Sequence, residues 1–414
     1  GACRAQSRAV GSASCGTDRA AGTGLRRGVA NAGGCVGRLA VSSSFVTSGQ
    51  TPPPLHARTV QIDDPGDLLA RLAGASDVAW IRRGDRMVGL GVAARAEVDS
   101  IEVGDRWWAD LAGRIAHTSE LPDAWGVGPV AFGSFAFDPG HTAARSVLVV
   151  PSVVVGRRGG RSWLTTVGVS DAPAALPPVA PPAPAPGRVD LAPGPLDAAG
   201  YAAEVARLVA AINAPDGELA KVVLARAVRA TAERPVLARW LAARLASDYP
   251  SCWTYHVDGL VGASPEMLIR AEGGLATSRV LAGTIRRSDP SQDEALAEAL
   301  SGSGKDLEEH ELAVESVAEA LRPFCSGMNV PDAPFVLQLP NVMHLASDVT
   351  GVMTRAVSSL TLAGRLHPSA AVCGTPTDAA LAAIAEHERL DRGRYAGPVG
   401  WIDTRGDGEW AIAL

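Results

Sequence analysis

Short apolar runs separated by turn residues fill the first half of the chain, between residues 45 and 171. Val, Ile and aromatic residues dominate several of these runs, and such residues favour strands over helices. We therefore predict that residues 45–171 form the β-rich N-terminal part of a larger domain. The predicted strands are Val78–Ile81, Met87–Val92, Val130–Phe137, Ser146–Val155 and Trp163–Val169.

Two segments show neither helical nor strand periodicity. Residues 1–44 are rich in Gly, Ala, Ser and Arg, and we predict that they form a disordered tail. Residues 172–196 are rich in Pro and Ala. Because Pro lacks a backbone N–H and fixes φ, this second segment predicts a loop or linker.

Helical and strand patterns alternate through residues 197–414, which indicates an α+β or α/β arrangement. A β-branched run, Lys221–Val228, predicts a strand, and Asp258-Gly259 and Thr404–Gly408 predict hairpin turns. The return strand Glu409–Leu414 has no polar exit, so we expect this part to be truncated at its C-terminus. The predicted helices are Tyr201–Ala214, Pro235–Ser247, Asp306–Phe324 and Thr377–Leu390, the last with Thr377 as its N-cap.

Composition and missing motifs argue against several classes of protein. With 38 Lys and Arg residues, 44 Asp and Glu residues and a net charge of −6, the chain as a whole is not built to coat nucleic acid. Its apolar runs end well short of the roughly 20 residues that a membrane-spanning helix needs. None of the six Cys residues forms a Cys-x-x-Cys pair, so we expect a reduced, cytoplasmic protein. The sequence also lacks a Gly-x-x-x-x-Gly-Lys phosphate loop, His-Glu-x-x-His and Gly-x-Ser-x-Gly.

Lysine occurs at only two positions, Lys221 and Lys305. All the other residues in the combined count of Lys and Arg are Arg. A desolvated amine can lose its proton and a guanidinium effectively never does, so each lysine is a candidate for a role that Arg cannot fill; chance is the alternative. Lys221 opens an apolar run, where partial desolvation would favour the neutral amine of a general base. A lysine that prevents edge pairing of a strand fits the same pattern.

Other candidate groups gather in the second half. Glu266 lies where a turn leads into an apolar strand, and a carboxyl among apolar residues can stay protonated and act as an acid, although most turn glutamates are simply exposed. Gly283 and Thr284 offer a close backbone approach and a hydroxyl to a ligand. Asp306 and Glu309 share one face of a predicted helix, which suits Mg²⁺; acid enrichment in the first helical turn is the simpler interpretation.

Taken in order, several segments resemble the chorismate-utilising enzymes, a family that includes isochorismate, salicylate, anthranilate and aminodeoxychorismate synthases. The residues that carry the resemblance are Lys221–Arg226, Gly262–Leu268, Leu281–Arg286, Lys305–Leu312, Gln338–Ala346, Leu366–Pro376 and Arg394–Trp401. The resemblance implies an α+β fold of large, mostly antiparallel sheets with flanking helices. It also implies a magnesium-dependent rearrangement of chorismate in a cleft.

The resemblance further implies a role for individual residues. Lys221 matches a base that activates water to attack C2 of chorismate, and Glu266 matches an acid that protonates the departing C4 hydroxyl. Glu309 matches a magnesium ligand, with Asp306 at most in support. The positions that match the substrate site are Gly283, Thr284, His344, Gly374 and Tyr395.

Lys221 also separates the members of the family, because the ammonia-using enzymes usually lack a lysine there and need no such base. Leu366–Pro376 and Tyr395–Trp401 are closer to the isochorismate synthases than to the salicylate synthases, which share the lysine and stand as the alternative. The family's last strand continues into a substrate-binding arginine and a second magnesium glutamate. Since neither lies in this sequence, we expect weak activity, and an inactive truncated homologue is a further alternative. The resemblance leaves menaquinone and siderophore synthesis equally open, and we expect a monomer or weak dimer whose partner is chorismate alone.

Overall fold

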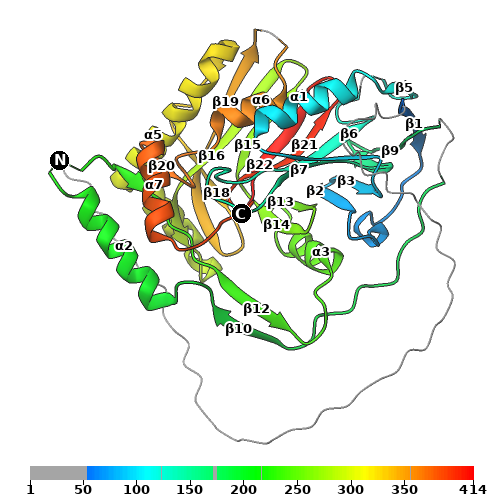
Figure 1. Cartoon of the computed structure of the whole chain (residues 1–414). Coiled ribbons are helices and arrows are strands. Elements are labelled where there is room, and N and C mark those ends of the chain that lie inside the picture. Colours follow the sequence, from blue (N-terminus) through cyan, green and yellow to red (C-terminus); the bar gives the residue numbers. More distant parts are fainter. Residues whose placement is uncertain (1–53, 123, 171–174, 216, 355) are drawn as a thin grey trace, which may run out of the picture.

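Two large sheets form the centre of the computed structural model, which describes residues 54–414 except 123, 171–174, 216 and 355 (Figure 1). The predicted tail, residues 1–44, lies outside the described residues. The eight-stranded sheet has the order β14 (Leu260–Ser264), β13 (Trp253–Val257), β2 (Val78–Arg82), β3 (Asp85–Leu90), β8 (Val153–Arg158), β9 (Arg161–Gly168), β1 (His56–Ile62) and β5 (Ala116–Ser119).

The second sheet has ten strands and contains the longest strands of the fold. Its order is β17 (Cys325–Asn329), β19 (Val342–Met353), β16 (Leu275–Arg286), β15 (Met267–Glu272), β22 (Gly408–Ile412), β21 (Pro398–Asp403), β6 (Val130–Ser134), β7 (Ser146–Val150) and β4 (Ala94–Val98), with β18 (Phe335–Gln338) beside β19. In the described part of the chain, the pair β1–β5 is parallel and the other ladders are antiparallel.

Smaller elements surround these sheets. Two short ribbons join β10 (Val189–Pro193) to β12 (Val228–Ala232) and β11 (Lys221–Val222) to β20 (Gly374–Thr375). The α-helices are α1 (Ile101–Ala112), α2 (Ala198–Ile212), α3 (Ala238–Asp248), α4 (Asp293–Ser301), α5 (Gly304–Leu321), α6 (Ser359–Leu366) and α7 (Thr377–His387), and single 3₁₀ turns lie at Leu69–Arg71, Pro290–Gln292 and Arg322–Phe324. Among the described residues, no helix is both long and apolar enough to cross a bilayer.

Apolar side chains between the layers explain how the sheets stack. Trp108 of α1 and Leu362 of α6 pack with Trp410 on one face of the ten-stranded sheet. On its other face, Phe132 and Trp401 belong to a cluster shared with β2 and β13 of the eight-stranded sheet. The far face of the eight-stranded sheet is covered by α3 and the first 3₁₀ turn. This helix, sheet, sheet, helix order confirms the predicted α+β fold with large antiparallel sheets.

Each large sheet joins a block of strands from the first half of the sequence to a block from the second half. In the eight-stranded sheet β13 pairs with β2, and in the ten-stranded sheet β21 pairs with β6. The red C-terminal strand β21 therefore lies beside the cyan N-terminal strand β6 in Figure 1. Residues 45–171 and 197–414 consequently contribute to one continuous structure.

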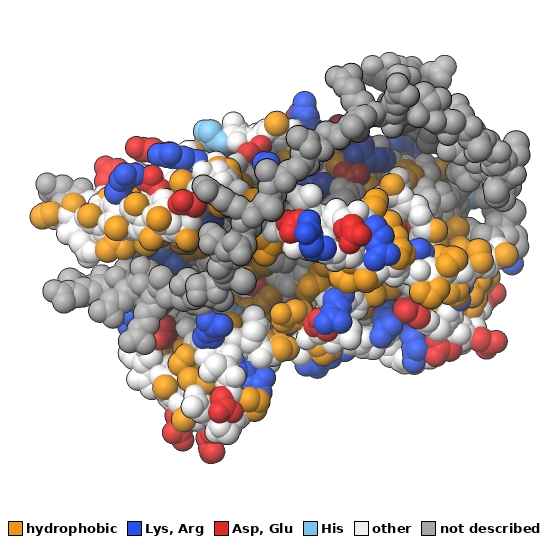
Figure 2. Space-filling model, turned by 90° about the horizontal axis from the view of Figure 1, so that it is seen from below, with side chains coloured by type: hydrophobic (Ala, Val, Ile, Leu, Met, Phe, Trp, Pro, Cys, Tyr) orange, Lys and Arg blue, Asp and Glu red, His pale blue; other side chains and the backbone are white. Residues whose placement is uncertain are grey.

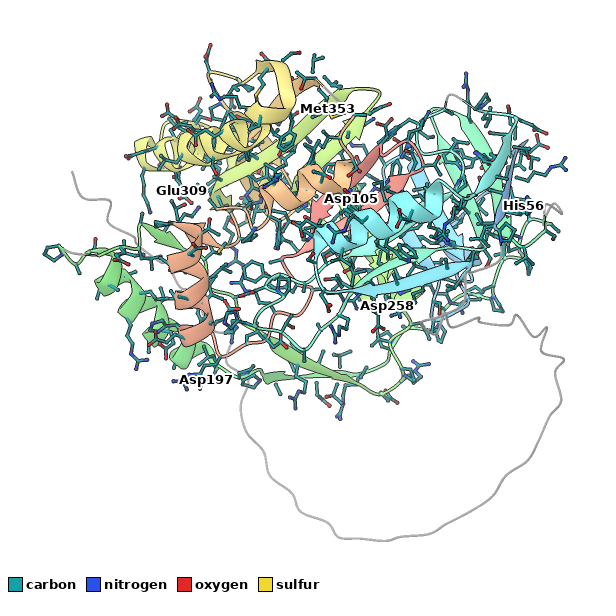
Figure 3. All side chains as sticks on the ribbon, turned by 45° about the horizontal axis from the view of Figure 1, so that its top comes forward. His56, Asp105, Asp197, Asp258, Glu309 and Met353 are labelled. Atoms are coloured by element: carbon teal, nitrogen blue, oxygen red, sulfur yellow. The ribbon has the colours of Figure 1, made fainter. Side chains whose placement is uncertain are left out.

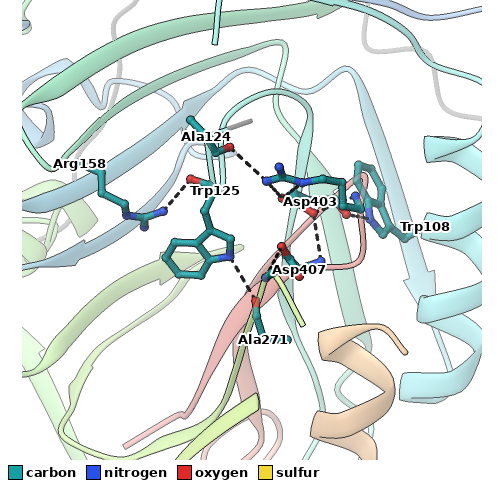
Figure 4. Close-up of polar contacts among 9 residues, drawn as sticks. Trp108, Ala124, Trp125, Arg158, Ala271, Asp403 and Asp407 are labelled. Atoms are coloured by element: carbon teal, nitrogen blue, oxygen red, sulfur yellow. Dashed lines mark hydrogen bonds and ion pairs between the residues drawn. The ribbon is translucent and has the colours of Figure 1, made fainter. Parts of the chain in front are cut away.

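A polar cluster fixes the turn between β21 and β22 (Figure 4). The buried Asp403 carboxylate accepts hydrogen bonds from the backbone N–H groups of Arg405 and Asp407, at 2.9 and 3.1 Å. The indole N–H of Trp108 donates to the Asp403 carbonyl oxygen at 2.9 Å. The same turn lies beside the end of β15, because Gly408 at the start of β22 pairs with Ala271.

Some local predictions are confirmed and others are wrong. The Asp258-Gly259 turn joins β13 and β14, with positive φ at both residues, as a two-residue hairpin requires. The strand predicted at Lys221–Val228 is limited to Lys221–Val222, because the chain leaves β20 after two residues. Thr377 is the first residue of α7 and makes no capping hydrogen bond; Pro376 occupies the N-cap position.

Charged side chains are mixed over the face shown in Figure 2. Lys and Arg side chains alternate with Asp and Glu side chains there, and no broad patch of one sign dominates the described atoms. Large single-sign patches are the electrostatic footprint of nucleic-acid binding, and this face shows none.

Candidate active site

Glu266 is a buried carboxyl at the start of β15. Glu266 is 7% exposed. Its backbone N–H donates to the Ser264 hydroxyl at 3.2 Å, and its backbone carbonyl oxygen accepts from the N–H of Ile412 at 3.1 Å. Burial raises the pKa of the Glu266 carboxyl from 4.5 to about 8, while the positive charge of Lys221 lowers it in part. The carboxyl is therefore mainly protonated at neutral pH and can donate a proton.

Lys221 is held in place by an unusually close backbone contact. β11 and β20 pair Lys221 with Thr375 and Val222 with Gly374. A Cβ atom on Gly374 would lie 2.1 Å from the Lys221 carbonyl oxygen, and Gly374 has a φ of +149°. Only glycine permits this approach, so Gly374 determines the position of the lysine backbone.

The Lys221 side chain pairs with Glu309. Its Nζ atom lies 2.9 Å from a Glu309 carboxylate oxygen, and the two side chains are 28% and 37% exposed. Glu309 lies on α5, and Figure 3 shows it on the side of the helix toward α7. Asp306, one turn earlier, bonds through its carboxylate to the Ser303 hydroxyl that caps this helix. The structure thus brings the predicted base and the predicted metal ligand into direct contact.

The donor set around Glu309 fits a lightly coordinated magnesium ion. No group of three or more His, Cys, Asp or Glu side chains suited to a metal occurs among the described residues. Mg²⁺ commonly keeps several waters and takes only one or two protein carboxylates together with oxygen atoms of a substrate. Glu309, partly exposed and one helical turn from Asp306, meets that modest requirement.

A bulge in β16 aligns two further polar groups. The pairing of β16 with β19 shifts between Ala282 and Thr284, and Gly283 between them has a φ of +77°. Beyond the bulge, the Thr284 hydroxyl and the Nδ1 atom of His344 lie 2.9 Å apart. Burial lowers the pKa of His344, although a hydrogen bond to the Gly283 backbone opposes this, so the ring is mainly neutral at pH 7.

A cavity of about 470 Å³ collects several of the predicted site residues. Glu266, Thr284, His344 and Tyr395 line it, and 470 Å³ is within the range of small-molecule sites. A second cavity of about 290 Å³ is lined by Glu266 and Gly374, so Glu266 lies between the two. Lys221, Gly283 and Glu309 line neither of these cavities.

Sequence reasoning missed much of the cavity wall. The wall includes Leu245 and Tyr249 at the end of α3, together with Cys252, Asn341 and Arg392. The amphipathic pattern of α3 predicts that one of its faces is buried, but not that this face borders a cavity. Nothing in the local sequence pattern marks the other three.

Comparison with known proteins identifies a matching family and several relatives. A family model described as "Chorismate binding enzyme" matches residues 186–414. A Mycobacterium tuberculosis protein with the provisional name isochorismate synthase MenF is 38% identical over 70% of this chain and 75% of its own length. The isochorismate synthase DhbC of Bacillus subtilis is 41% identical over 48% of this chain and 53% of its own.

The solved structure of MenF, the menaquinone-specific isochorismate synthase of Escherichia coli, superposes with a TM-score of 0.71. It is 26% identical, and the match covers 89% of this chain and 87% of that one. The match of the family model over residues 186–414 and the identity to these relatives show that the chain belongs to the family of chorismate-binding enzymes.

Proposed function

We propose that this protein is an isochorismate synthase, which converts chorismate to isochorismate with the help of Mg²⁺. One observation supports this most directly. A buried carboxyl with a pKa of about 8, Glu266, lies within electrostatic reach of Lys221. An acid that holds its proton at neutral pH and an amine that can accept one form the pair that this exchange of hydroxyl groups requires.

The two groups act on opposite sides of the ring. Lys221 takes a proton from water, whose oxygen forms a bond to C2 of chorismate. The ring double bonds shift, and the C4–O bond breaks as Glu266 gives its proton to the departing hydroxyl, which leaves as water. One water enters and one leaves, so chorismate and isochorismate are isomers.

Glu309 is the proposed magnesium ligand, with Asp306 in a supporting position. When bound, the cation would neutralise a carboxylate of the substrate and hold it beside α5. The Lys221 amine lies 2.9 Å from the same Glu309 carboxylate, so the proposed base and the proposed metal ligand lie side by side.

The remaining predicted residues form the proposed substrate site. Thr284, His344 and Tyr395 line the larger cavity and offer hydroxyl and imidazole groups to the substrate's oxygen atoms. Gly283 shapes the bulge beside Thr284, and Gly374 allows β20 to approach Lys221.

Product analysis tests this proposal. Chorismate is incubated with the protein and Mg²⁺, and the products are separated by chromatography. We expect isochorismate without pyruvate, and loss of turnover in Lys221→Ala. Release of pyruvate with salicylate would instead assign salicylate synthase activity. A folded protein that consumes no chorismate would refute both enzyme assignments.

A further inference from the structure

The segment that follows Lys221 is held by side chains in place of a neighbouring strand. The N–H of Val223 still bonds to the Cys373 carbonyl oxygen, at 2.8 Å. Beyond it, the Leu224 carbonyl oxygen accepts from the Tyr201 hydroxyl at 3.2 Å, and the Ala225 N–H donates to Glu388 at 2.8 Å. These contacts explain why an apolar, β-branched run is extended here without belonging to a sheet.

Glu388 and Arg392 provide most of this support. Arg392 donates through Nε and Nη2 to the two carboxylate oxygens of Glu388, at 2.7 and 2.6 Å. The Glu388 and Arg392 side chains are 0% and 4% exposed. The pair is therefore a fully buried, bidentate ion pair.

Arg392 also binds both backbone segments that meet at the lysine. Its Nη2 donates to the Val223 carbonyl oxygen at 2.7 Å, and its Nη1 donates to the Val372 carbonyl oxygen at 2.8 Å. Val223 follows the β11 strand that carries Lys221, and Val372 precedes Gly374 in β20. One guanidinium thus connects the two strands of the β11–β20 ribbon at the end where the ribbon stops.

Arg392 borders the larger cavity, which raises the question of whether it binds substrate. These contacts occupy four of the five N–H groups of its guanidinium. The planar guanidinium of Arg392 therefore already donates to Glu388 and to two backbone carbonyl oxygens. The arrangement is suited to holding backbone, not to clamping a substrate carboxylate.

We propose that Glu388 and Arg392 are positioning residues that hold Lys221 in its catalytic place. This inference rests on the proposed function for the role of Lys221 as a base. Replacing a buried ion pair by apolar residues is often neutral for stability, so the attraction between the two charges does not by itself explain why they lie here. Its contacts to Val223 and Ala225 instead set the path of the chain directly after the lysine.

The test uses the double variant Glu388→Met with Arg392→Leu, which keeps an apolar core and removes the contacts to Val223, Val372 and Ala225. Glu388→Gln is the milder variant, because it still accepts from the Ala225 N–H. The matched control is Arg244→Ala with Asp248→Ala, an i,i+4 pair of the same type that is largely exposed on α3.

We expect the double variant to lower kcat by about 100-fold, the loss typical of a misplaced catalytic group, with little change in KM. Glu388→Gln should fall between it and the unchanged control. In a Lys221→Ala background the double substitution should lower the residual kcat no further, because the group that it positions is already absent. A further loss in that background, or an unchanged kcat in the Lys221 protein, would overturn the inference.

A second readout is independent of activity. Because the chain has only two lysines, reductive methylation with ¹³C in a Lys305→Arg background gives Lys221 a single lysine resonance in NMR spectra. The double variant should shift this resonance, and the Arg244 control should not. If the unmodified protein shows no turnover, the proposed function fails. The Lys221 resonance would still test whether Glu388 and Arg392 position the lysine. An unchanged Lys221 resonance would refute it.

Discussion

The Nζ atom of Lys221 lies 2.9 Å from a carboxylate oxygen of Glu309. The proposed base and the proposed metal ligand are therefore partners in an ion pair. Both side chains are about one-third exposed, so water and other charges can compete for each of them. A group that binds the Glu309 carboxylate would therefore compete with the Lys221 amine for it.

Replacement of Lys221 tests the role of its amine. Lys221→Ala and Lys221→Arg should both lower kcat by at least about 100-fold, because a guanidinium keeps the positive charge and cannot accept a proton. Isochorismate formation measured by chromatography checks this. Lys305→Arg, at an exposed position in the first turn of α5, should retain full activity. Activity in Lys221→Arg would show that the charge, and not proton transfer, is what matters.

Replacement of Glu309 tests the metal site. Glu309→Gln should raise the Mg²⁺ concentration for half-maximal activity by roughly 10-fold or more, because a neutral amide is a weaker ligand for a hard cation. The matched control is Glu308→Gln, at the exposed neighbouring position of the same helix. Chelation of metal by EDTA should abolish turnover, and added Mg²⁺ should restore it. Equal Mg²⁺ dependence in both variants would remove Glu309 from the site.

The buried carboxyl of Glu266 should make stability depend on pH. Its pKa is about 8 in the folded protein and 4.5 without burial, so between these pH values the folded state binds the extra proton. The free energy of unfolding should therefore fall with rising pH across that window, by up to about 1.4 kcal/mol per pH unit.

Glu266→Gln keeps the shape of this side chain without the ionisation. Urea unfolding at pH 5 and pH 8 should show a smaller pH dependence in Glu266→Gln than in the unmodified protein, and the variant should be inactive. Identical pH dependence in the two proteins would mean that Glu266 ionises normally in the folded state.

Gly374→Ala should damage the site through the backbone. The new Cβ would meet the Lys221 carbonyl oxygen at 2.1 Å and the Cβ of Ala380 at 2.7 Å. We expect a loss of about 1–3 kcal/mol in unfolding free energy and a fall in kcat as β11 is displaced. Gly259→Ala, which also has a positive φ but meets no atom within 4 Å, should cost stability and leave kcat unchanged.

Local signals in the sequence predict part of this fold. Asp258-Gly259 specifies a hairpin because both residues tolerate a positive φ, and the apolar stripe of α5 specifies its buried face. The prediction omits α1, although Ser100 caps its first turn and Gly113 follows its end. These signals depend on residues that are close together in the sequence. They therefore predict single helices and hairpins better than they predict which distant strands pair.

The site depends on pairings between distant segments, which is why it is harder to predict. The burial of Glu266 follows from its apolar surroundings in sequence. The Lys221–Glu309 contact does not, because the two residues come from a short strand and a helix far apart in the chain. Glu388 similarly meets Ala225 across 163 positions, and Arg392 meets Val223 across 169.

The pairing of early strands with late strands in both sheets has a consequence for biosynthesis. β2 and β6 leave the ribosome long before β13 and β21, the strands that cover one edge of each. The indole N–H of Trp80 donates a hydrogen bond to Glu409, which is synthesised 329 positions later. Partly made chains therefore present open strand edges, which favours slow, post-translational folding and a need for chaperones. Residues 186–414 expressed alone would lack those partners, so we expect the matched segment not to fold independently.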